Sequence, residues 1–263
     1  MVRKNRDAPF DSYHLPTPSY GDDINKKRTI FNKGAKELSY LCAVCGGELE
    51  QADTVAVCTF CGHETPAQYL CAAGHHICEE CQLADWPQVV ERVCEGSRET
   101  DPAAIVNLIM KHPMSVMHSP QHHILVTPAV LAALRNSGLL PLKPGRLASA
   151  IERTQGIPLG TCGMRGECGA AICVGALVSI LTGATFMKGR ERSLALQASA
   201  EALLAIAQAG GPRCCKQSVY LALETTSIFL KRELDLDLPV EPCCDFAARN
   251  KECKKERCRY YVG

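Results

Sequence analysis

The sequence predicts a mainly α protein: a small cysteine-rich metal-binding module, then an all-α helical bundle, and last a short cysteine-rich tail. The module is indicated by the 17 cysteines, most of which fall in CxxC-type pairs. The bundle is indicated by capped apolar runs after residue 100, where no strand pattern of useful length occurs. A composition of 46% hydrophobic and 22% charged residues is that of a soluble globular protein.

Charge and hydropathy restrict the partners. The formal net charge of +1 gives no field that would attract nucleic acid or an anionic membrane. The longest apolar run, residues 170–184, is too short and too interrupted to span a bilayer. Because the first ten residues lead into a polar segment rather than a signal peptide, we expect a cytoplasmic protein whose cysteines are metal ligands or reactive thiols. We expect a small-molecule substrate or a protein partner, with a homo-oligomer left open.

Four segments differ in composition. Residues 1–36 are rich in Pro, Asp, Asn and Lys without a period, which predicts a flexible arm. Residues 37–95 should form a zinc-binding module with one or two metals, residues 100–235 the all-α domain, and residues 236–263 a basic, cysteine-rich tail.

The module carries four consecutive ligand pairs. Its candidate zinc ligands are Cys42, Cys45, Cys58, Cys61, Cys71, His75, Cys78 and Cys81. The first two pairs are CxxCG turns, and two such turns on a hairpin close a tetrahedral thiolate site, which resembles a zinc ribbon. The later Gly-His-x2-Cys-x2-Cys run is similar to a step of RING-like and treble-clef modules, which favours His75 over His76 as a ligand.

The four pairs can share metals sequentially, first with second and third with fourth, or in a crossed manner, with alternate pairs together. We prefer the sequential arrangement. Zinc would supply folding energy that so short a segment cannot obtain from a core, so the module should be structural. Because its ligands are confined to residues 40–82, we expect Cys58→Ser to unfold this segment and to leave the helices largely intact. Cys94 should be an ordinary thiol.

Helix signals follow in the second domain. Asp101-Pro102 and Thr127-Pro128 each read as an N-cap followed by proline at the first helical position. Glycines at 138, 156, 183 and 210 close successive helices. The expected helices span about residues 102–111, 128–136, 144–155, 168–181, 190–208 and 215–232.

Two glycine- and cysteine-rich loops, residues 160–173 and 209–216, lie in the middle of this domain. Their candidate cluster ligands are Cys162, Cys168, Cys173 and Cys214, and Cys215 is a candidate nucleophile; buried core thiols are the alternative. Cys168 and Cys214 precede helices and have arginines nearby, so we expect their thiol pKa values to be lowered.

Other candidate residues surround these loops. Three histidines in six residues, at positions 118, 122 and 123, could bind metal or move a proton. Arg165 and Arg213 could pair with a carboxylate. The tail offers a third cysteine box for zinc or an iron–sulfur cluster: Cys243, Cys244, Cys253 and Cys258.

Three stretches, GECGAA, SILTGAT and GGPRCCK, carry a resemblance to an uncharacterised domain-of-unknown-function family of anaerobic bacteria and archaea. The order of features is also distantly similar to the α domain of iron–sulfur L-serine dehydratases, whose Gly-Cys loops hold a [4Fe-4S] cluster. Residues 180–185 would stand for that family's turn and residues 211–215 for its second loop, while its third cluster cysteine has no clean equivalent. The resemblance covers about a quarter of the chain and implies a cluster near these loops.

We therefore expect an iron–sulfur-dependent enzyme of lyase or sulfur-transfer type in an anaerobic cytosol. His118, His122 or His123 would move a proton, Arg165 or Arg213 would bind a carboxylate, and Cys214 or Cys215 could carry sulfur. The alternative is a non-catalytic zinc-binding adaptor or an accessory subunit of a metalloenzyme complex.

Overall fold

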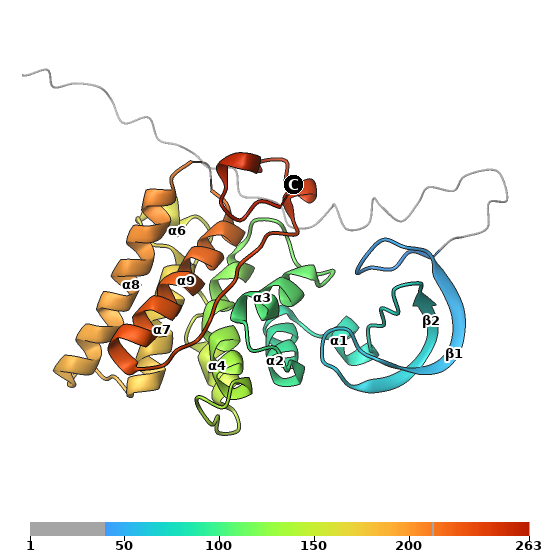
Figure 1. The fold of residues 1–263 in the computed structure, drawn as a ribbon, viewed down its shortest axis with the longest axis horizontal. Coiled ribbons are helices and arrows are strands. Elements are labelled where there is room, and N and C mark those ends of the chain that lie inside the picture. Colours follow the sequence, from blue (N-terminus) through green and yellow to red (C-terminus); the bar gives the residue numbers. More distant parts are fainter. Residues whose placement is uncertain (1–39, 212, 263) are drawn as a thin grey trace, which may run out of the picture. The chain divides into compact units, whose positions relative to one another are not determined.

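The computed structural model describes residues 40–211 and 213–262 (Figure 1). These residues belong to one compact unit, Ser39–Gly263. The arm predicted for residues 1–36 lies outside the described residues.

The described chain begins with an antiparallel hairpin. Strand β1 (Leu49–Val57) pairs with β2 (Glu64–Cys71), with Leu49 opposite Cys71 at the open end and an irregularity after Gln51. Figure 1 shows the two strands curving together around the short helix α1 (Glu79–Leu83). This register places the end of β2 close to the residues that precede β1, a relationship that decides how the metal ligands are shared.

A helix that the sequence analysis did not delimit connects the hairpin to the bundle. Helix α2 (Trp86–Gly96) starts with a capping box: Asp85 accepts a hydrogen bond from the Gln88 amide, and the Gln88 side chain accepts one from the Asp85 amide. Helix α2 packs against three helices of the bundle, α3 (Pro102–Lys111), α4 (Val126–Asn136) and α5 (Arg146–Glu152). It is therefore part of the helical core.

Two of the predicted helix starts have different outcomes. Asp101 caps α3 as expected, because its carboxylate accepts a hydrogen bond from the Ala103 amide. Thr127 is not an N-cap: α4 already begins at Val126, and the Thr127 hydroxyl donates to the Cys173 carbonyl. The buried hydroxyl thus joins α4 to the next layer rather than closing its own helix end.

The segment between α3 and α7 contains short elements. The histidine-rich loop forms a 3-10 turn, η1 (Pro120–Ile124), and the first glycine- and cysteine-rich loop contains α6 (Thr161–Met164). Helix α5 is shorter than the predicted residues 144–155, because Gly145 takes a left-handed conformation with φ +73° and the helix can start only after it.

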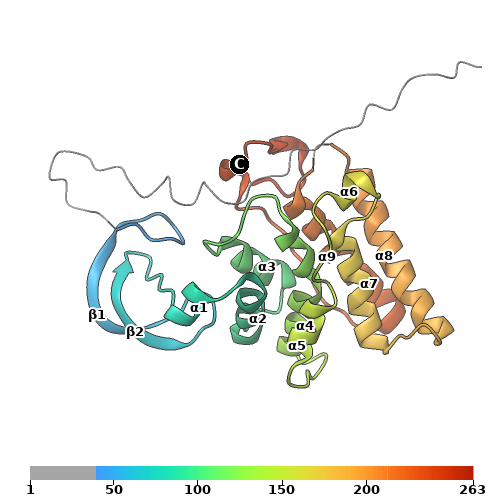
Figure 2. The ribbon, with the colours of Figure 1, turned by 180° about the vertical axis from the view of Figure 1, so that it is seen from behind.

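Three long helices make the other half of the bundle: α7 (Gly169–Thr182), α8 (Gly189–Ala209) and α9 (Cys215–Leu234). Their bounds agree with the predicted helices, and Gly183 ends α7 in the left-handed conformation. Figures 1 and 2 show α7, α8 and α9 side by side, and α7 is buried on most sides. No helix in the described ranges combines the length and the apolarity that a membrane span needs.

The α7–α8 contact depends on Gly175, because a Cβ at this position would lie 2.0 Å from the Ser199 hydroxyl oxygen and 2.8 Å from the Ala195 carbonyl oxygen. We expect Gly175→Ala to destabilise the protein by about 1–3 kcal/mol through overpacking. Gly189→Ala is the matched control, since its Cβ would meet no atom within 4 Å. Chemical denaturation followed by helical circular dichroism checks both, and equal midpoints for the two variants would contradict the close contact.

After α9 the tail returns along the bundle (Figure 1). It contains two 3-10 turns, η2 (Ala247–Arg249) and η3 (Lys255–Arg257), and one isolated bridge between Cys244 and Tyr261. The buried Asn107 of α3 donates to the Cys243 carbonyl and accepts a hydrogen bond of 2.6 Å from the Tyr220 hydroxyl of α9. The tail is thus fixed to the helices that precede it.

Candidate functional site

Eight ligands of the cysteine-rich module form two groups of four. One is Cys42, Cys45, Cys71 and His75; the other is Cys58, Cys61, Cys78 and Cys81. Within each group all ligand atoms lie within 4.8 Å of one another. The eight predicted ligands, with His75 rather than His76, are thus brought together as two groups that could each hold a metal ion. The preferred sequential pairing is wrong, because the first pair shares a site with the third and the second with the fourth.

The hairpin register explains the crossed pairing. Leu49 lies opposite Cys71, so the turn that carries Cys42 and Cys45 meets the far end of β2. The second ligand pair lies in the turn between the strands, where it meets the segment that enters α1. There the Cys78 amide donates to the Cys58 sulfur. A sequential pairing would require the two ends of β1 to meet.

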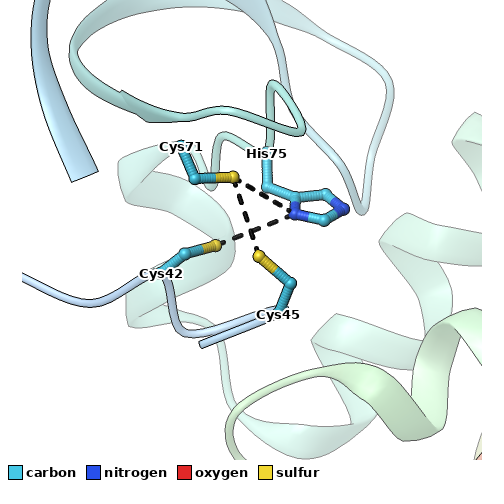
Figure 3. A group of neighbouring side chains, drawn as sticks. All are labelled: Cys42, Cys45, Cys71 and His75. Carbon is cyan, nitrogen blue, oxygen red and sulfur yellow. Dashed lines mark hydrogen bonds between the residues drawn. The ribbon is translucent and has the colours of Figure 1, made fainter. Parts of the chain in front are cut away.

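The first site has the spacing of a tetrahedral centre (Figure 3). The sulfurs of Cys45 and Cys71 are 3.8 Å apart, and His75 Nδ1 lies 3.8 Å from the Cys42 sulfur and 3.4 Å from the Cys71 sulfur. Four ligands about 2.0–2.3 Å from one ion are separated by similar distances, so Cys₃His coordination fits without rearrangement.

The second site is buried and continuous with the helical core. All four of its cysteines are buried. The neighbouring Phe60 ring packs edge-on against His112 at the end of α3, and His112 donates through Nε2 to the Cys81 carbonyl. Gly96, the last residue of α2, lies against the Cys61 backbone. The cysteines of this candidate metal site and the helices share one core.

Backbone amides lower the thiol pKa of one cysteine in each site. Burial disfavours the Cys58 thiolate, but hydrogen bonds from backbone amides outweigh it and lower the pKa to about 7. Burial likewise acts against Cys71, whose pKa is lowered to about 6 by amides that include that of His75. Burial raises the pKa of Cys61 to about 11. Each site thus offers an easily ionised thiol beside others that a cation would deprotonate.

The two glycine- and cysteine-rich loops of the helical domain open onto a common cleft of about 340 Å³. Its polar and reactive side chains are His122, His123, Cys162, Cys168, Arg213, Cys214 and Cys215. The prediction that the histidine-rich loop faces the cysteine loops is confirmed for His122 and His123. Cys168 and Cys214 are, as predicted, the residues that precede α7 and α9, so both helix N-termini lie at this cleft.

Three other predicted residues lie elsewhere. His118 is directed toward the tail, with Nε2 3.2 Å from Asn250 Oδ1. Cys173 is fully buried in α7, where its thiol donates to the His123 carbonyl and burial raises its pKa to about 11. Arg165 is exposed and does not line the cleft.

The predicted lowering of the Cys214 pKa is wrong. Burial raises this pKa, and the amides of Gln217 and Lys216 together with the Lys216 charge offset only part of that effect. The position before a helix was correctly predicted, but the partial burial of the sulfur could not be read from the sequence.

Lys216 is a site residue that the sequence analysis missed. It is only 2% exposed, and its ammonium group lies 3.1 Å from both the Met117 carbonyl oxygen and His122 Nε2. His122 Nδ1 is 3.2 Å from the Ser119 carbonyl, so the imidazole donates there and accepts from lysine. Burial lowers the His122 pKa to about 3, which keeps the ring neutral, and burial lowers the Lys216 pKa to about 8.

The tail cysteines separate into two kinds. Cys243 is exposed, whereas Cys244, Cys253 and Cys258 line a second, smaller cavity together with Cys214. These four do not form a third group with all ligand atoms within 4.8 Å, and the described residues contain only the two such groups of the module. The predicted tail box therefore combines with a residue of the central loops.

The fold and these sites define a class: a mainly helical, cysteine-rich protein with two crossed sites that could bind metal and, in its helical part, a cysteine-lined cleft. The chain belongs to a family of unknown function, DUF5714, whose model matches residues 90–261. The match includes the cleft and the tail but neither four-ligand site of the module. Neither the curated proteins nor the solved structures contain a match to the chain, so the suggested similarity to L-serine dehydratases has no support from these comparisons.

Proposed function

We propose that the protein is an iron–sulfur-dependent enzyme that acts on a small anionic substrate in the cysteine-lined cleft. One observation carries the proposal: the cleft brings together thiols of both glycine- and cysteine-rich loops, histidines of a third loop and an arginine. A volume of about 340 Å³ suits a small metabolite. Seven cysteines other than the module ligands line this cleft or the neighbouring cavity, which supports a cofactor that uses thiolates.

The cleft is arranged for an anion. The N-termini of α7 and α9 lie beside it, and unpaired amides together with the aligned peptide dipoles make such ends favourable for negative charge. Arg213 is exposed at the cleft and can pair with a carboxylate. A small carboxylate would thus bind with its acid group toward Arg213 and its reactive part toward the thiols.

Two residue types then supply chemistry of the lyase or sulfur-transfer type. Cys162 is exposed and Cys215 partly exposed at the cleft, so either can act as a nucleophile or carry sulfur. His123 lines the cleft, and no hydrogen bond to its ring is formed by a side chain of the described residues, so we assign proton transfer to this histidine. His122 instead orients Lys216.

A matched pair of arginines tests the substrate class. We expect anaerobically prepared protein to bind small 2-hydroxy, 2-amino or 2-thiol carboxylates, and Arg213→Ala to weaken binding at least tenfold by removing the charge that pairs with the acid. Arg165→Ala, in the other glycine- and cysteine-rich loop but outside the cleft, should leave affinity unchanged. Isothermal titration calorimetry measures both. Equal losses for the two variants, or no binding by wild-type protein that contains iron and sulfide, would refute the proposal.

An adaptor or accessory subunit is the second candidate, favoured by exposed apolar residues on the hairpin. Val55, Val57 and Tyr69 are 63%, 54% and 45% exposed, so the hairpin offers apolar surface to a partner. Metal analysis separates the two candidates. Zinc without iron or acid-labile sulfide supports the adaptor, and iron with sulfide supports the enzyme.

A further inference from the structure

Four cysteines from two distant segments line the small cavity between the start of α9 and the tail. Cys214 comes from the second glycine- and cysteine-rich loop, and Cys244, Cys253 and Cys258 come from the tail. The aromatic rings of Phe246, Tyr220 and Tyr260 complete much of the wall. Four thiols gathered around one apolar cavity, from segments that α9 separates in the sequence, are more than core packing requires.

The spacing of these sulfurs is wider than that of the mononuclear sites. In the module, ligand atoms 3.4–3.8 Å apart match a single tetrahedral ion. The four cavity cysteines do not meet the 4.8 Å limit that both module sites satisfy. A cubane cluster separates its four thiolates further than one ion does, because four irons and four sulfides stand between them.

A backbone amide is directed at one of the four sulfurs, and amides near two others favour their thiolate forms. The Lys255 amide donates to the Cys253 sulfur over 3.3 Å. Amides at the start of α9 act to lower the pKa of Cys214, and the Phe246 amide does the same for Cys244, although burial raises both pKa values. Such N–H···S bonds are typical of thiolates that ligate iron–sulfur clusters and adjust their potentials.

A buried cation next to the cavity lacks a carboxylate. Lys216 lines the cavity, is almost fully buried, and forms no salt bridge with an acidic side chain of the described residues. Its ammonium group lies 4.9 Å from the centre of the Phe246 ring. A buried charge without a counter-charge is costly, and an anionic cluster would supply that counter-charge.

We propose that Cys214, Cys244, Cys253 and Cys258 hold a [4Fe-4S] cluster. This ligand set differs from both sequence-based hypotheses, which placed one cluster on the central loops and a separate metal on the tail. The free space is small, about 20 Å³, so loading requires outward movement at the cavity wall. Lys254 lines the cavity and donates to the Ala209 and Gly210 carbonyls and to Gln217 Oε1, so an outward movement of the tail must release these bonds.

The inference deepens the proposed function, because it rests on the same iron–sulfur dependence and locates the cofactor. Cys214 and Gln217 line both the cluster cavity and the substrate cleft, so the cluster lies behind one wall of the cleft. Four cysteine ligands leave none of the irons open to substrate. Reaction at the substrate therefore falls to the residues that remain free in the cleft, Cys162, Cys168 and Cys215.

The test uses full-length protein, purified anaerobically or reconstituted with ferrous iron and sulfide. We expect about four irons and four sulfides per chain in addition to the metals of the module, broad absorption near 400 nm and a [4Fe-4S] EPR signal after reduction. Cys244→Ser and Cys253→Ser should each lose most of the iron and sulfide. Cys243→Ser, which changes the exposed neighbour, and Cys168→Ser, which changes a cleft thiol, should keep wild-type content.

Helical circular dichroism and retained module metal establish that each variant is folded, and Cys258→Ser serves if one of the other tail variants is not. Wild-type cluster content in a folded Cys253→Ser variant would overturn the ligand set, as would cluster loss in Cys168→Ser. Zinc alone in wild-type protein would overturn the cluster. Failure of substrate binding with a normal cluster spectrum would instead count against the proposed cleft chemistry alone.

Discussion

Cys58→Ser should release about one metal ion per chain and destabilise the helical domain together with the hairpin, by more than about 4 kcal/mol in the free energy of unfolding. The reason is that Cys58 and its three partner cysteines are buried in the same core as α2 and α3. This replaces the expectation from sequence that only residues 40–82 would unfold. Chemical denaturation followed by helical circular dichroism, with metal analysis of the folded protein, measures the effect.

Cys45→Ser is the control, because Cys45 is exposed and belongs to the other site. It should also release about one metal ion, yet leave the unfolding midpoint of the helices close to that of the wild type. If both variants lowered the helical midpoint equally, the two sites would contribute alike to the core. If Cys58→Ser left it unchanged, the shared core would be refuted.

Gly96→Ala should be nearly as damaging without changing any metal ligand. A Cβ on Gly96 would lie 1.9 Å from the Cys61 carbonyl oxygen and 2.5 Å from its carbonyl carbon. Both atoms are backbone and cannot rotate away, so α2 or the ligand turn must move. We expect a loss of about 3 kcal/mol or more in the free energy of unfolding and weaker metal retention against a chelator.

Glu95→Ala controls for the helix itself, since Glu95 is the exposed preceding residue. It should shift stability by no more than about 0.5 kcal/mol. Thermal unfolding with and without a chelator compares the two variants. A Gly96→Ala protein with wild-type midpoint and metal retention would show that the helix end and the ligand turn do not constrain each other.

The helices were the more predictable part of the fold. Asp101 before proline predicts a helix start, and Gly183 after an apolar run predicts a helix end, because both signals depend on local backbone preferences. The structure has α3 starting after Asp101 and α7 ending at Gly183. The capping box of Asp85 and Gln88 is an equally local signal, and it would have located α2. Thr127 shows the limit of such signals, because its hydroxyl donates to the buried Cys173 carbonyl of another helix instead of capping its own.

The sites were predictable as residues and less so as groups. Ligand spacing identifies Cys42, Cys58 and their neighbours but is the same for sequential and crossed pairing, which only the hairpin register decides. No sequence pattern identified Lys216 as a site residue, because its role comes from burial against the loop of Met117 and His122, almost one hundred residues away in the sequence. For the same reason no sequence pattern joins Cys214 to the tail cysteines.

The crossed ligand pairs also make the two metal ions dependent on each other. The segment between Cys45 and Cys71 contains the second ligand pair, and the segment between Cys61 and Cys78 contains the third, so the two closed loops interlock. An ion at either site has already brought the strands of the hairpin together. The loop that the other ion must close is then effectively shorter, and its entropic cost is lower. Occupancy should therefore be positively cooperative in the wild-type chain, and a variant that has lost one site should hold its remaining ion more weakly.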